Sequence, residues 1–405
     1  MSTVTERPSG PGLTPEPPSG PATDDRPKKK KRHKSPLWTK LVTAFGAVLA
    51  LVAAGGIVGA KYFLGQLTDN IQTTSSVLDN PASGSKSGGG TSAGKLPDGA
   101  MNLLMLGLDT RENWDQAGIG SRSDTIIIMH ISAGHDSAQM ISIPRDTKAD
   151  IPADPEVGYR GGSDKINAAY EVGSRNGKGW QGGAKEATAA VHKLTGISFD
   201  GVAVIDFDGF KGMLEAMGGV YMCVDKDMWS SHYTVDSKGK VSYAKGANPD
   251  NPPSNALWFR KGCRNMAPWE ALEYSRLRHS SNGDYDRQRH QQQLLKAMAK
   301  KASSSGVLTN PAKVSKILAA AGKSLKMDTH GVSVTDFMFG LKGLAGADLV
   351  PVKTNSGTYA SVDNGAAEGI NEVTRQLFAA TAADKLDGFL LDHPSLVIDG
   401  STPEK

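Results

Sequence analysis

The chain has 405 residues, a formal net charge of +4 and two cysteines. This length is enough for about two or three average domains, but residues 1–36 are rich in Pro, Ser, Gly and Lys and carry almost no large apolar side chains. Such a segment buries too little surface to offset the entropy lost on ordering, so we expect it to be disordered. The composition therefore excludes a chain that folds along its whole length.

A basic run followed by an apolar run predicts a membrane anchor. Residues 28–34 read KKKKRHK, and Leu41–Ala60 is uncharged and overwhelmingly apolar. The apolar run is long enough to cross a bilayer as a helix, and the positive-inside rule puts the basic side in the cytoplasm. Alone, the basic run would also fit a nucleic-acid patch, and a cleaved signal peptide is the other alternative, disfavoured by its long leader. We predict a cytoplasmic tail at 1–36, a single-pass transmembrane helix at 37–64 and an extracytoplasmic remainder with no nucleic-acid partner.

The rest of the chain divides by composition. Residues 65–95 are rich in Gly, Ser, Thr and Lys, which is typical of a flexible linker. We expect one folded domain at 96–390 and a tail at 391–405. Both cysteines, Cys223 and Cys263, lie in the outer part, where an even count favours a disulfide over buried free thiols. Closing that loop would contribute about 4 kcal/mol in the loop-entropy model.

Apolar runs predict the strands and helices of the outer domain. Helices are expected at Ala184–Leu194, ending at Gly196, and after Asp208 as the cap, through Met217. Further helices are expected from Pro268 to about Ser275, from Asp284 to about Ser303, after Asn310 and Ser333, and at Ala366–Ala382. Strands that alternate with such helices indicate a layered α/β fold. The expected strands are Met101–Gly107, Ile126–Ile131, Met140–Ile143, Val202–Phe207, Val220–Val224 and Leu349–Val352.

The segment between the cysteines reads differently. Gly, Asn and Pro are interleaved with aromatic residues, so we expect an irregular surface excursion bounded by the disulfide. Its aromatic side chains would either contact a sugar or lipid or form a small satellite core, and the second alternative is favoured. The aromatic residues are Trp229, Tyr233, Tyr243, Trp258 and Phe259.

Charged residues two apart mark the ends of several apolar runs. In an extended chain such residues point to the same side, and Leu277 would point the other way, into the core. Guanidinium forks match phosphate oxygens, and carboxylates can bind a divalent metal. The sequence therefore predicts a rim that holds two joined phosphates and Mg²⁺, although each aspartate could instead only pair with a nearby arginine. The pairs are Asp109 and Arg111, Arg122 and Asp124, and Arg276 and Arg278, with Arg145 after Pro144.

The helix expected from Asp284 adds a second surface. Asp284 is positioned as its cap, and one helical stripe passes from polar to apolar residues. This would suit an amphiphilic ligand with an anionic head, but from the helix alone an ordinary core stripe is favoured. His130 lies within a strand and is expected in the core rather than as a catalyst. The stripe comprises Arg287, Gln291, Leu294, Leu295 and Met298.

Several motifs together resemble the LytR-CpsA-Psr family. The resemblance implies an enzyme that moves a cell-wall glycopolymer, such as a teichoic acid, capsule or arabinogalactan, from a polyprenyl pyrophosphate carrier onto peptidoglycan. It also implies an α-β-α sandwich around a central mixed sheet, with an apolar tunnel for the polyprenyl chain. The motifs are Leu108–Arg111, Ser121–Thr125, Ser142–Thr147, Lys165–Tyr170, Gly218–Val220, Ala271–Arg278 and Asp284–Arg287.

The resemblance also implies roles for individual residues. Asp109 and Asp124 resemble the magnesium-associated acids, Asp284 is a weaker candidate for a general base, and Lys165 matches a position without an assigned role. His290 replaces an arginine that the family commonly has, and Arg289, one position earlier, is turned by about 100° on a helix, so we leave it out of the site. The predicted pyrophosphate-binding residues are Arg111, Arg122, Arg145, Arg276, Arg278, Arg287 and Gln291, of which Arg145 and Arg278 are also expected to act in catalysis.

Two rival functions stay open at this point. A pyrophosphate hydrolase would use the same site with water as acceptor. A non-catalytic anchored protein that binds lipid or polymer, or a transcriptional attenuator, would need no turnover at all.

Overall fold

The computed structural model describes residues 71–79, 99–109, 120–244, 251–280, 282–307, 310–332, 334, 337 and 349–398. The predicted cytoplasmic tail and transmembrane helix lie outside these ranges, as does most of the helix expected after Ser333. Among the residues that the structure describes, no helix is both long enough and apolar enough to cross a membrane.

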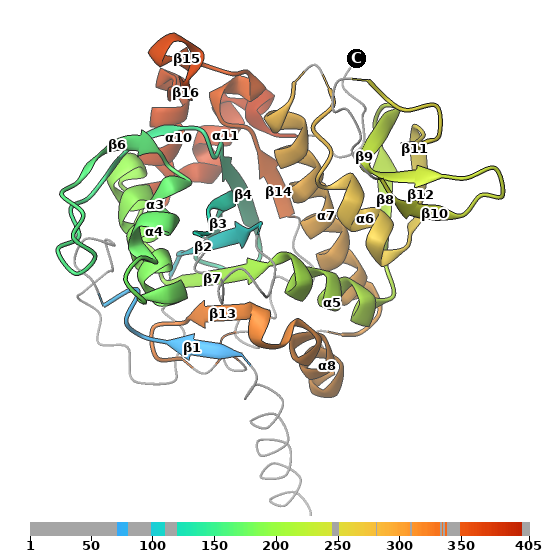
Figure 1. Cartoon of the computed structure of the whole chain (residues 1–405). Coiled ribbons are helices and arrows are strands. Elements are labelled where there is room, and N and C mark those ends of the chain that lie inside the picture. The colour runs from blue at the N-terminus through green and yellow to red at the C-terminus, as the bar shows by residue number, and fades with distance from the viewer. Residues whose placement is uncertain are drawn as a thin grey trace, which may run out of the picture. The chain divides into compact units, whose positions relative to one another are not determined.

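A seven-stranded mixed sheet forms the centre of the domain (Figure 1). The parallel pairs are β1 with β13, β7 with β2, and β4 with β14, and the remaining neighbours run antiparallel. This confirms the expected central mixed sheet. In spatial order the strands are β1 (Gln72–Thr74), β13 (Leu325–Asp328), β7 (Gly201–Asp206), β2 (Met101–Leu108), β3 (Ser123–Ile131), β4 (Ala138–Ile143) and β14 (Leu349–Val352).

Helices cover both faces of this sheet, as Figure 1 shows. Alternate residues of β2 supply the two cores: Leu104 and Leu106 pack with Ala187 of α4, whereas Leu103 and Met105 pack in the core of α8. The period of two in a strand explains this division, and the α-β-α sandwich is confirmed. The first layer holds α3 (Ala168–Gly173), α4 (Gly179–Thr195), α10 (Glu372–Ala382) and α11 (Leu386–Asp392), and the second side holds α5 (Phe207–Met217), α6 (Pro268–Tyr274), α7 (Asp284–Ser304) and α8 (Pro311–Ala321).

The folded domain extends beyond the expected limits of 96 and 390. Residues 71–79 lie within the predicted linker, yet Val77 and Leu78 are fully buried and their backbone N–H groups donate to Asp328 Oδ2, each at 3.0 Å. At the other end, Leu396 is buried and Val397 bridges to Val352. The linker and tail predictions are therefore wrong at these two places, because distant parts of the chain bury short apolar stretches.

Three helix starts and one cap differ from expectation: α4 begins at Gly179 rather than Ala184, and the others are α5 and α10, whereas α7 begins at Asp284 as predicted with a different cap. Asp206, not Asp208, caps α5, with its Oδ1 accepting from Gly209 N at 3.0 Å. Helix α10 begins at Glu372 rather than Ala366, because Asn371 caps it and β16 (Ala367–Glu368) pairs with β15 (Ser361–Val362). Asp284 lies in the first turn of α7, since Gly283 occupies the cap position. The end of α4 at Gly196 is as predicted, with a left-handed φ of 71°.

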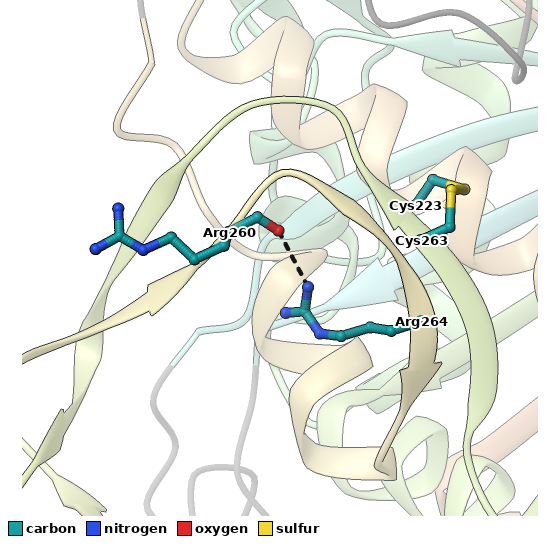
Figure 2. The surroundings of a disulfide bond; sticks show 4 residues. All are labelled: Cys223, Arg260, Cys263 and Arg264. Carbon is teal, nitrogen blue, oxygen red and sulfur yellow. Dashed lines mark hydrogen bonds between the residues drawn. A yellow bond between two sulfur atoms is a disulfide. The ribbon is translucent and has the colours of Figure 1, made fainter.

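A disulfide joins facing residues of two short strands. β8 (Val220–Val224) and β12 (Gly262–Met266) pair antiparallel, and Cys223 lies opposite Cys263. Figure 2 shows this bond, which confirms the predicted pairing. Nearby, Arg264 Nη1 donates to the carbonyl oxygen of Arg260 at 3.1 Å and ties β12 to the preceding turn (Figure 2).

The segment between the cysteines is more regular than expected. It forms a three-stranded antiparallel sheet of β10 (Val241–Tyr243), β9 (Met228–Val235) and β11 (Ala256–Phe259). Met228 and Phe259 join a third core with Tyr274 of α6, so the satellite-core prediction is confirmed for Phe259. It is wrong for Tyr243 and Trp258, whose side chains are exposed. We call Val220–Met266 the disulfide lobe.

Candidate functional site

The strand order brings three charged positions to one edge of the sheet. β2 and β7 run parallel, so their carboxyl ends meet, and β3 is antiparallel to β2, so it begins where β2 ends. Ile126 of β3 pairs with Ile143 of β4. Asp109 after β2, Asp124 at the start of β3 and Arg145 after β4 therefore share this edge.

A cavity of about 460 Å³ opens beside these residues. Its charged end is exposed, since the Asp109 side chain is 63% accessible, whereas Leu294 in its wall is 1% accessible. The expected stripe on α7 lines it from Arg287 to Leu295, but Met298 does not take part. The polar wall includes Asp109, Asp124, Arg276, Arg278, Arg287 and Gln291, and the apolar wall includes Ile127, Ile205, Phe207, Phe210, Leu272, Leu294 and Leu295.

Two arginines hold the acids of this site in place. Arg145 Nη1 lies 2.6 Å from Asp124 Oδ2, and its Nε lies 3.8 Å from Asp284 Oδ1. Arg287 Nη2 lies 2.7 Å from Asp284 Oδ1 and donates to the Asp124 carbonyl oxygen at 2.9 Å. These contacts link β3, β4 and α7 through Asp124 and Asp284.

Two other arginines are only loosely paired. Arg278 Nη2 lies 3.5 Å from Asp124 Oδ2, and Arg276 Nη2 lies 3.9 Å from Asp109 Oδ1, both longer than a normal charged hydrogen bond. Arg276 also stacks over the Phe207 ring at 4.4 Å. Burial and the positive charges of Arg287 and Arg145 lower the pKa of Arg278. Both guanidinium groups therefore keep donors for an anion. Arg145 and Asp284 do not line the cavity themselves, but they contact residues that do. We call the following seven residues the cavity cluster: Asp109, Asp124, Arg145, Arg276, Arg278, Asp284 and Arg287.

The charge state of Asp284 bears on its expected role as a base. Burial alone would raise the pKa of Asp284, but Arg287, a hydrogen bond from Gln288 and Arg145 together hold it below its ordinary value. A carboxylate stabilised in this way is a weak proton acceptor. Its geometry suits the positioning of Arg145 and Arg287 better than proton transfer.

The four remaining predicted residues are placed differently from one another. Arg122 is not brought to the cavity, because its Nε pairs with Glu171 Oε2 of α3 at 2.7 Å. Arg111 lies outside the described residues. Gln291 lines the cavity, and its Oε1 is buried with no hydrogen-bond partner among the described residues. Lys165 Nζ lies 2.9 Å from Asp146 Oδ1, and Asp146 Oδ2 lies 3.6 Å from Arg145 Nε. Lys165 is therefore linked to Arg145 through Asp146.

A second group of charges lies on another side of α7. Arg289 pairs with Asp225 and, at 2.8 Å, with Asp286 Oδ1. Lys226 Nζ also contacts Asp286 at 2.5 Å, and His290 Nε2 lies 3.6 Å from Asp225 Oδ1. We call these five residues the buried cluster. Arg289 does not line the cavity, in agreement with its exclusion from the predicted site.

Two carboxylates of the cavity have the chemistry of a magnesium site. Asp109 and Asp124 both line it, and no group of three or more His, Cys, Asp or Glu side chains placed to hold a metal occurs in the described part of the chain. Mg²⁺ is commonly held by one or two carboxylates together with substrate phosphates. The pair therefore fits Mg²⁺ only in company with a phosphate ligand.

Sequence reasoning missed the contribution of the disulfide lobe. Ser231 and His232 of β9 line the cavity, although the lobe carried no recognised motif. Glu273 lies within the Ala271–Arg278 motif, but no local pattern indicates that its side chain is buried beside the lobe. His130, in contrast, is a core residue as expected, with its Nδ1 2.8 Å from Asn102 Oδ1.

One protein family and several characterised proteins match most of the sequence. The LytR-CpsA-Psr (LytR_cpsA_psr) family model matches residues 65–375. The chain is 27% identical over 296 residues to the polyisoprenyl-teichoic acid–peptidoglycan teichoic acid transferase TagV of Bacillus subtilis, covering 72% of this chain and 65% of the relative. It is 30% identical over 356 residues to the cell wall biosynthesis protein LcpA of Corynebacterium glutamicum, covering 78% of this chain and 60% of the relative.

The crystal structure of B. subtilis TagV supports the fold. It superimposes with a TM-score of 0.51 at 22% sequence identity, covering 72% of this chain and 99% of that chain. In contrast, the match to the full sequences of the two relatives covers 65% and 60% of their lengths, so the present chain spans less than two thirds of each. Because the family model matches more than half of the sequence, the chain belongs to the LytR-CpsA-Psr family.

Proposed function

We propose that the domain transfers a glycopolymer from a polyprenyl pyrophosphate carrier onto peptidoglycan. The observation that carries the proposal is one cavity with loosely paired arginines at its exposed end and an apolar interior. A pyrophosphate head and an isoprenoid tail would match these two halves. The printed name of TagV, a polyisoprenyl-teichoic acid–peptidoglycan teichoic acid transferase, points to the same class of reaction.

The residues of the cavity cluster would divide the work. Arg276 and Arg278 would bind the pyrophosphate, because their guanidinium forks can each grip two phosphate oxygens. Arg145 and Arg287 would hold the side chains of Asp124 and Asp284 in position, because they form short ion pairs with these carboxylates. Phe210, Leu294 and Leu295 would contact the isoprenoid chain, with a gain of about 25 cal/mol per Å² of apolar surface buried.

Asp109 and Asp124 would hold Mg²⁺ against the bound pyrophosphate. When bound, the ion would supply positive charge to the phosphoryl oxygens. The carboxylates would also repel a free pyrophosphate in the absence of the ion, since they add negative charge to the same wall.

In the reaction, an acceptor sugar hydroxyl would attack the phosphorus nearer the polymer. A new P–O bond forms, the P–O bond to the lipid phosphate breaks, and the electron pair leaves with the lipid phosphate. Arg276 and Arg278 would stabilise the charge that grows on this leaving group. Bound water as acceptor would give the rival hydrolase.

A reconstituted assay tests the proposal. Full-length protein would receive a short prenyl-pyrophosphoryl-N-acetylglucosamine donor and Mg²⁺, with or without purified peptidoglycan. We expect donor consumption that depends on peptidoglycan and a phosphodiester-linked product. Equal consumption without peptidoglycan and without linked product would establish the hydrolase. Tight donor binding without consumption would establish the binding protein.

We also propose the topology that the sequence predicts. Residues 37–64 would cross the cell membrane, with 1–36 in the cytoplasm and the domain outside. Protease added to spheroplasts should digest the domain and leave an epitope at the N-terminus protected. A mature protein that starts at Lys61 would contradict the uncleaved anchor.

A further inference from the structure

The disulfide lobe reaches the cavity through a break in its sheet. Trp229 and Thr234 of β9 face Trp258 and Ala256 of β11, so residues 230–233 stand opposite Leu257 alone. Extra residues on one strand form a bulge, which redirects side chains and is common beside active sites. Here the bulge carries Ser231 and His232, and both line the cavity.

A buried carboxylate holds the bulge and its histidine. Ser230 Oγ donates to Glu273 Oε1 and accepts from the backbone N–H groups of His232 and Tyr233, each at 3.0 Å. His232 Nδ1 lies 2.9 Å from Glu273 Oε1, and the Glu273 side chain is only 1% accessible. Since a carboxylate accepts, Nδ1 carries the proton and donates. Nε2 is then the nitrogen with a lone pair.

Resting on the proposed transfer reaction, we propose that His232 is the catalytic base of the site and that Glu273 positions it. Nε2 would take the proton from the acceptor hydroxyl as its oxygen bonds to phosphorus and the lipid phosphate leaves with the electron pair. The Glu273 carboxylate would stabilise the imidazolium that forms, because it already contacts Nδ1. The proton is later released to water, and the cycle needs no other reactant.

The surroundings of His232 separate it from the aspartate that the sequence suggested. Asp284 is held in ion pairs with Arg287 and Arg145, whereas the His232 side chain is 32% accessible and makes its one ion pair among the described residues with Glu273. The charged or titratable groups near it include Arg276, whose Nη1 lies 4.0 Å from Glu273 Oε2, and Tyr243 of β10, whose ring centroid lies 6.3 Å from the imidazole. Tyr233, whose pKa is raised by burial and by Glu273, and His279, which also lines the cavity, complete this set among the described residues. Arg276 thus ties the histidine to the pyrophosphate end of the cavity.

The test compares His232→Gln, Glu273→Gln and a distant control, His192→Gln, in the full-length protein with the donor and peptidoglycan described above. General base catalysis typically contributes 10²–10⁴-fold, so we expect kcat to fall about 100-fold in His232→Gln with the donor KM within about twofold. Glu273→Gln should lower kcat by about tenfold, and His192→Gln should match the wild type. In the wild type, kcat should rise as the pH increases, because Nε2 must carry a free lone pair to accept the proton, and His232→Gln should flatten that rise.

Chemical rescue adds a readout that a structural role would not move. Imidazole added to His232→Ala should restore part of the lost kcat, but it should not restore Glu273→Gln. If the wild type consumes no donor, the proposed transfer fails and the base assignment fails with it. If the wild type is active and His232→Gln keeps its kcat and pH profile, only the assignment of His232 is overturned. A rise in KM alone, without rescue by imidazole, would equally overturn it.

Discussion

The cavity cluster and the buried cluster both combine aspartates with arginines, yet the pairing of these residues differs. In the buried cluster, Arg289 is gripped by Asp225 and Asp286, and although burial alone would lower the pKa of Arg289, these two carboxylates raise it. In the cavity cluster, Arg278 is 3.5 Å from its nearest carboxylate oxygen and its pKa is lowered. A cluster that satisfies its own charges stabilises the fold, whereas one that leaves donors loosely paired is prepared for a ligand.

Helix α7 contributes residues to both clusters, and the two sets lie on different sides of the helix. Arg287 and Gln291 are one turn apart and line the cavity, whereas Arg289 and His290 face Asp225 of the disulfide lobe. A helix turns about 100° per residue, so neighbouring positions serve different surfaces. The first three predictions below each change one cluster and leave the other intact, and the fourth concerns Glu186 of α4, which belongs to neither.

The largest expected effect is loss of stability in Arg289→Met. Removing one partner of a buried pair leaves Asp225 without an arginine partner, whereas Asp286 keeps Lys226. Breaking a buried pair in this way costs about 3–5 kcal/mol. Urea unfolding of the purified protein should show this loss. The control Arg375→Met, which breaks an exposed pair with Glu372, should change stability by less than about 1 kcal/mol. Similar losses in both variants would refute the distinction between buried and exposed pairs.

Arg278→Ala should act on turnover rather than on the fold. A hydrogen bond to a charged group contributes about 1.5–3 kcal/mol, so kcat/KM for the donor should fall about 10- to 100-fold. Arg278→Lys should recover only part, because an ammonium lacks the planar fork. Urea unfolding should show little change. A large loss of stability with normal turnover would place Arg278 among structural residues.

Asp109→Asn should raise the Mg²⁺ concentration needed for half-maximal turnover, by about tenfold for a loss of 1.4 kcal/mol. The exposed Asp109 side chain makes only a 3.9 Å contact to Arg276 among the described residues, so its removal should leave stability unchanged. Titration of turnover with Mg²⁺ measures the effect. An unchanged titration curve would show that Asp109 is not a metal ligand.

The fourth prediction concerns a buried acid that makes no ion pair among the described residues, Glu186 of α4. Burial, together with Asp154, raises the pKa of Glu186 to about 7, and its Oε1 lacks a hydrogen-bond partner among the described residues. The folded state therefore binds this proton more tightly than the unfolded state. Its contribution to stability is complete below about pH 4.3 and is lost as pH rises through about 7.

Glu186→Gln should remove that loss. At pH 8 it should be more stable than the wild type by an amount on the order of 1–3 kcal/mol, taking 1.36 kcal/mol per pKa unit. Urea unfolding at pH 4, 6 and 8 measures the difference, which should shrink toward low pH. A constant difference at all three values would contradict proton binding by Glu186.

The sequence could predict the sheet and most of the site, because both depend on local patterns. Apolar runs indicated β2, β3, β4, β7 and β14, and charges at their ends indicated the edge that the structure confirms for Asp109, Asp124 and Arg145. The spacing rule also kept Leu277, which is 1% accessible, in the core between Arg276 and Arg278.

The sequence-based predictions failed where a residue distant in the sequence determines the local structure or the contact of a side chain. Arg122 precedes β3, which begins at Ser123, so the alternation of a strand does not govern it, and Glu171 captures its side chain. Gln72–Thr74 became a strand because β13 offered an edge 254 residues away. The bulge at His232 depends on Glu273, and no local pattern announces that contact.

The disulfide between β8 and β12 has a consequence for how such proteins diversify. It fixes the base of the lobe, so Asp227–Lys261, which lie outside the buried cluster, can change in length or sequence while their two ends stay in register. Doubling a closed loop costs only about 0.6 kcal/mol. One wall of the cavity can therefore be rebuilt by insertion or exchange without refolding the sheet that supplies the arginines. In the proposed reaction, the lobe wall that faces the acceptor could then vary among related proteins while the arginines that bind the donor stay the same.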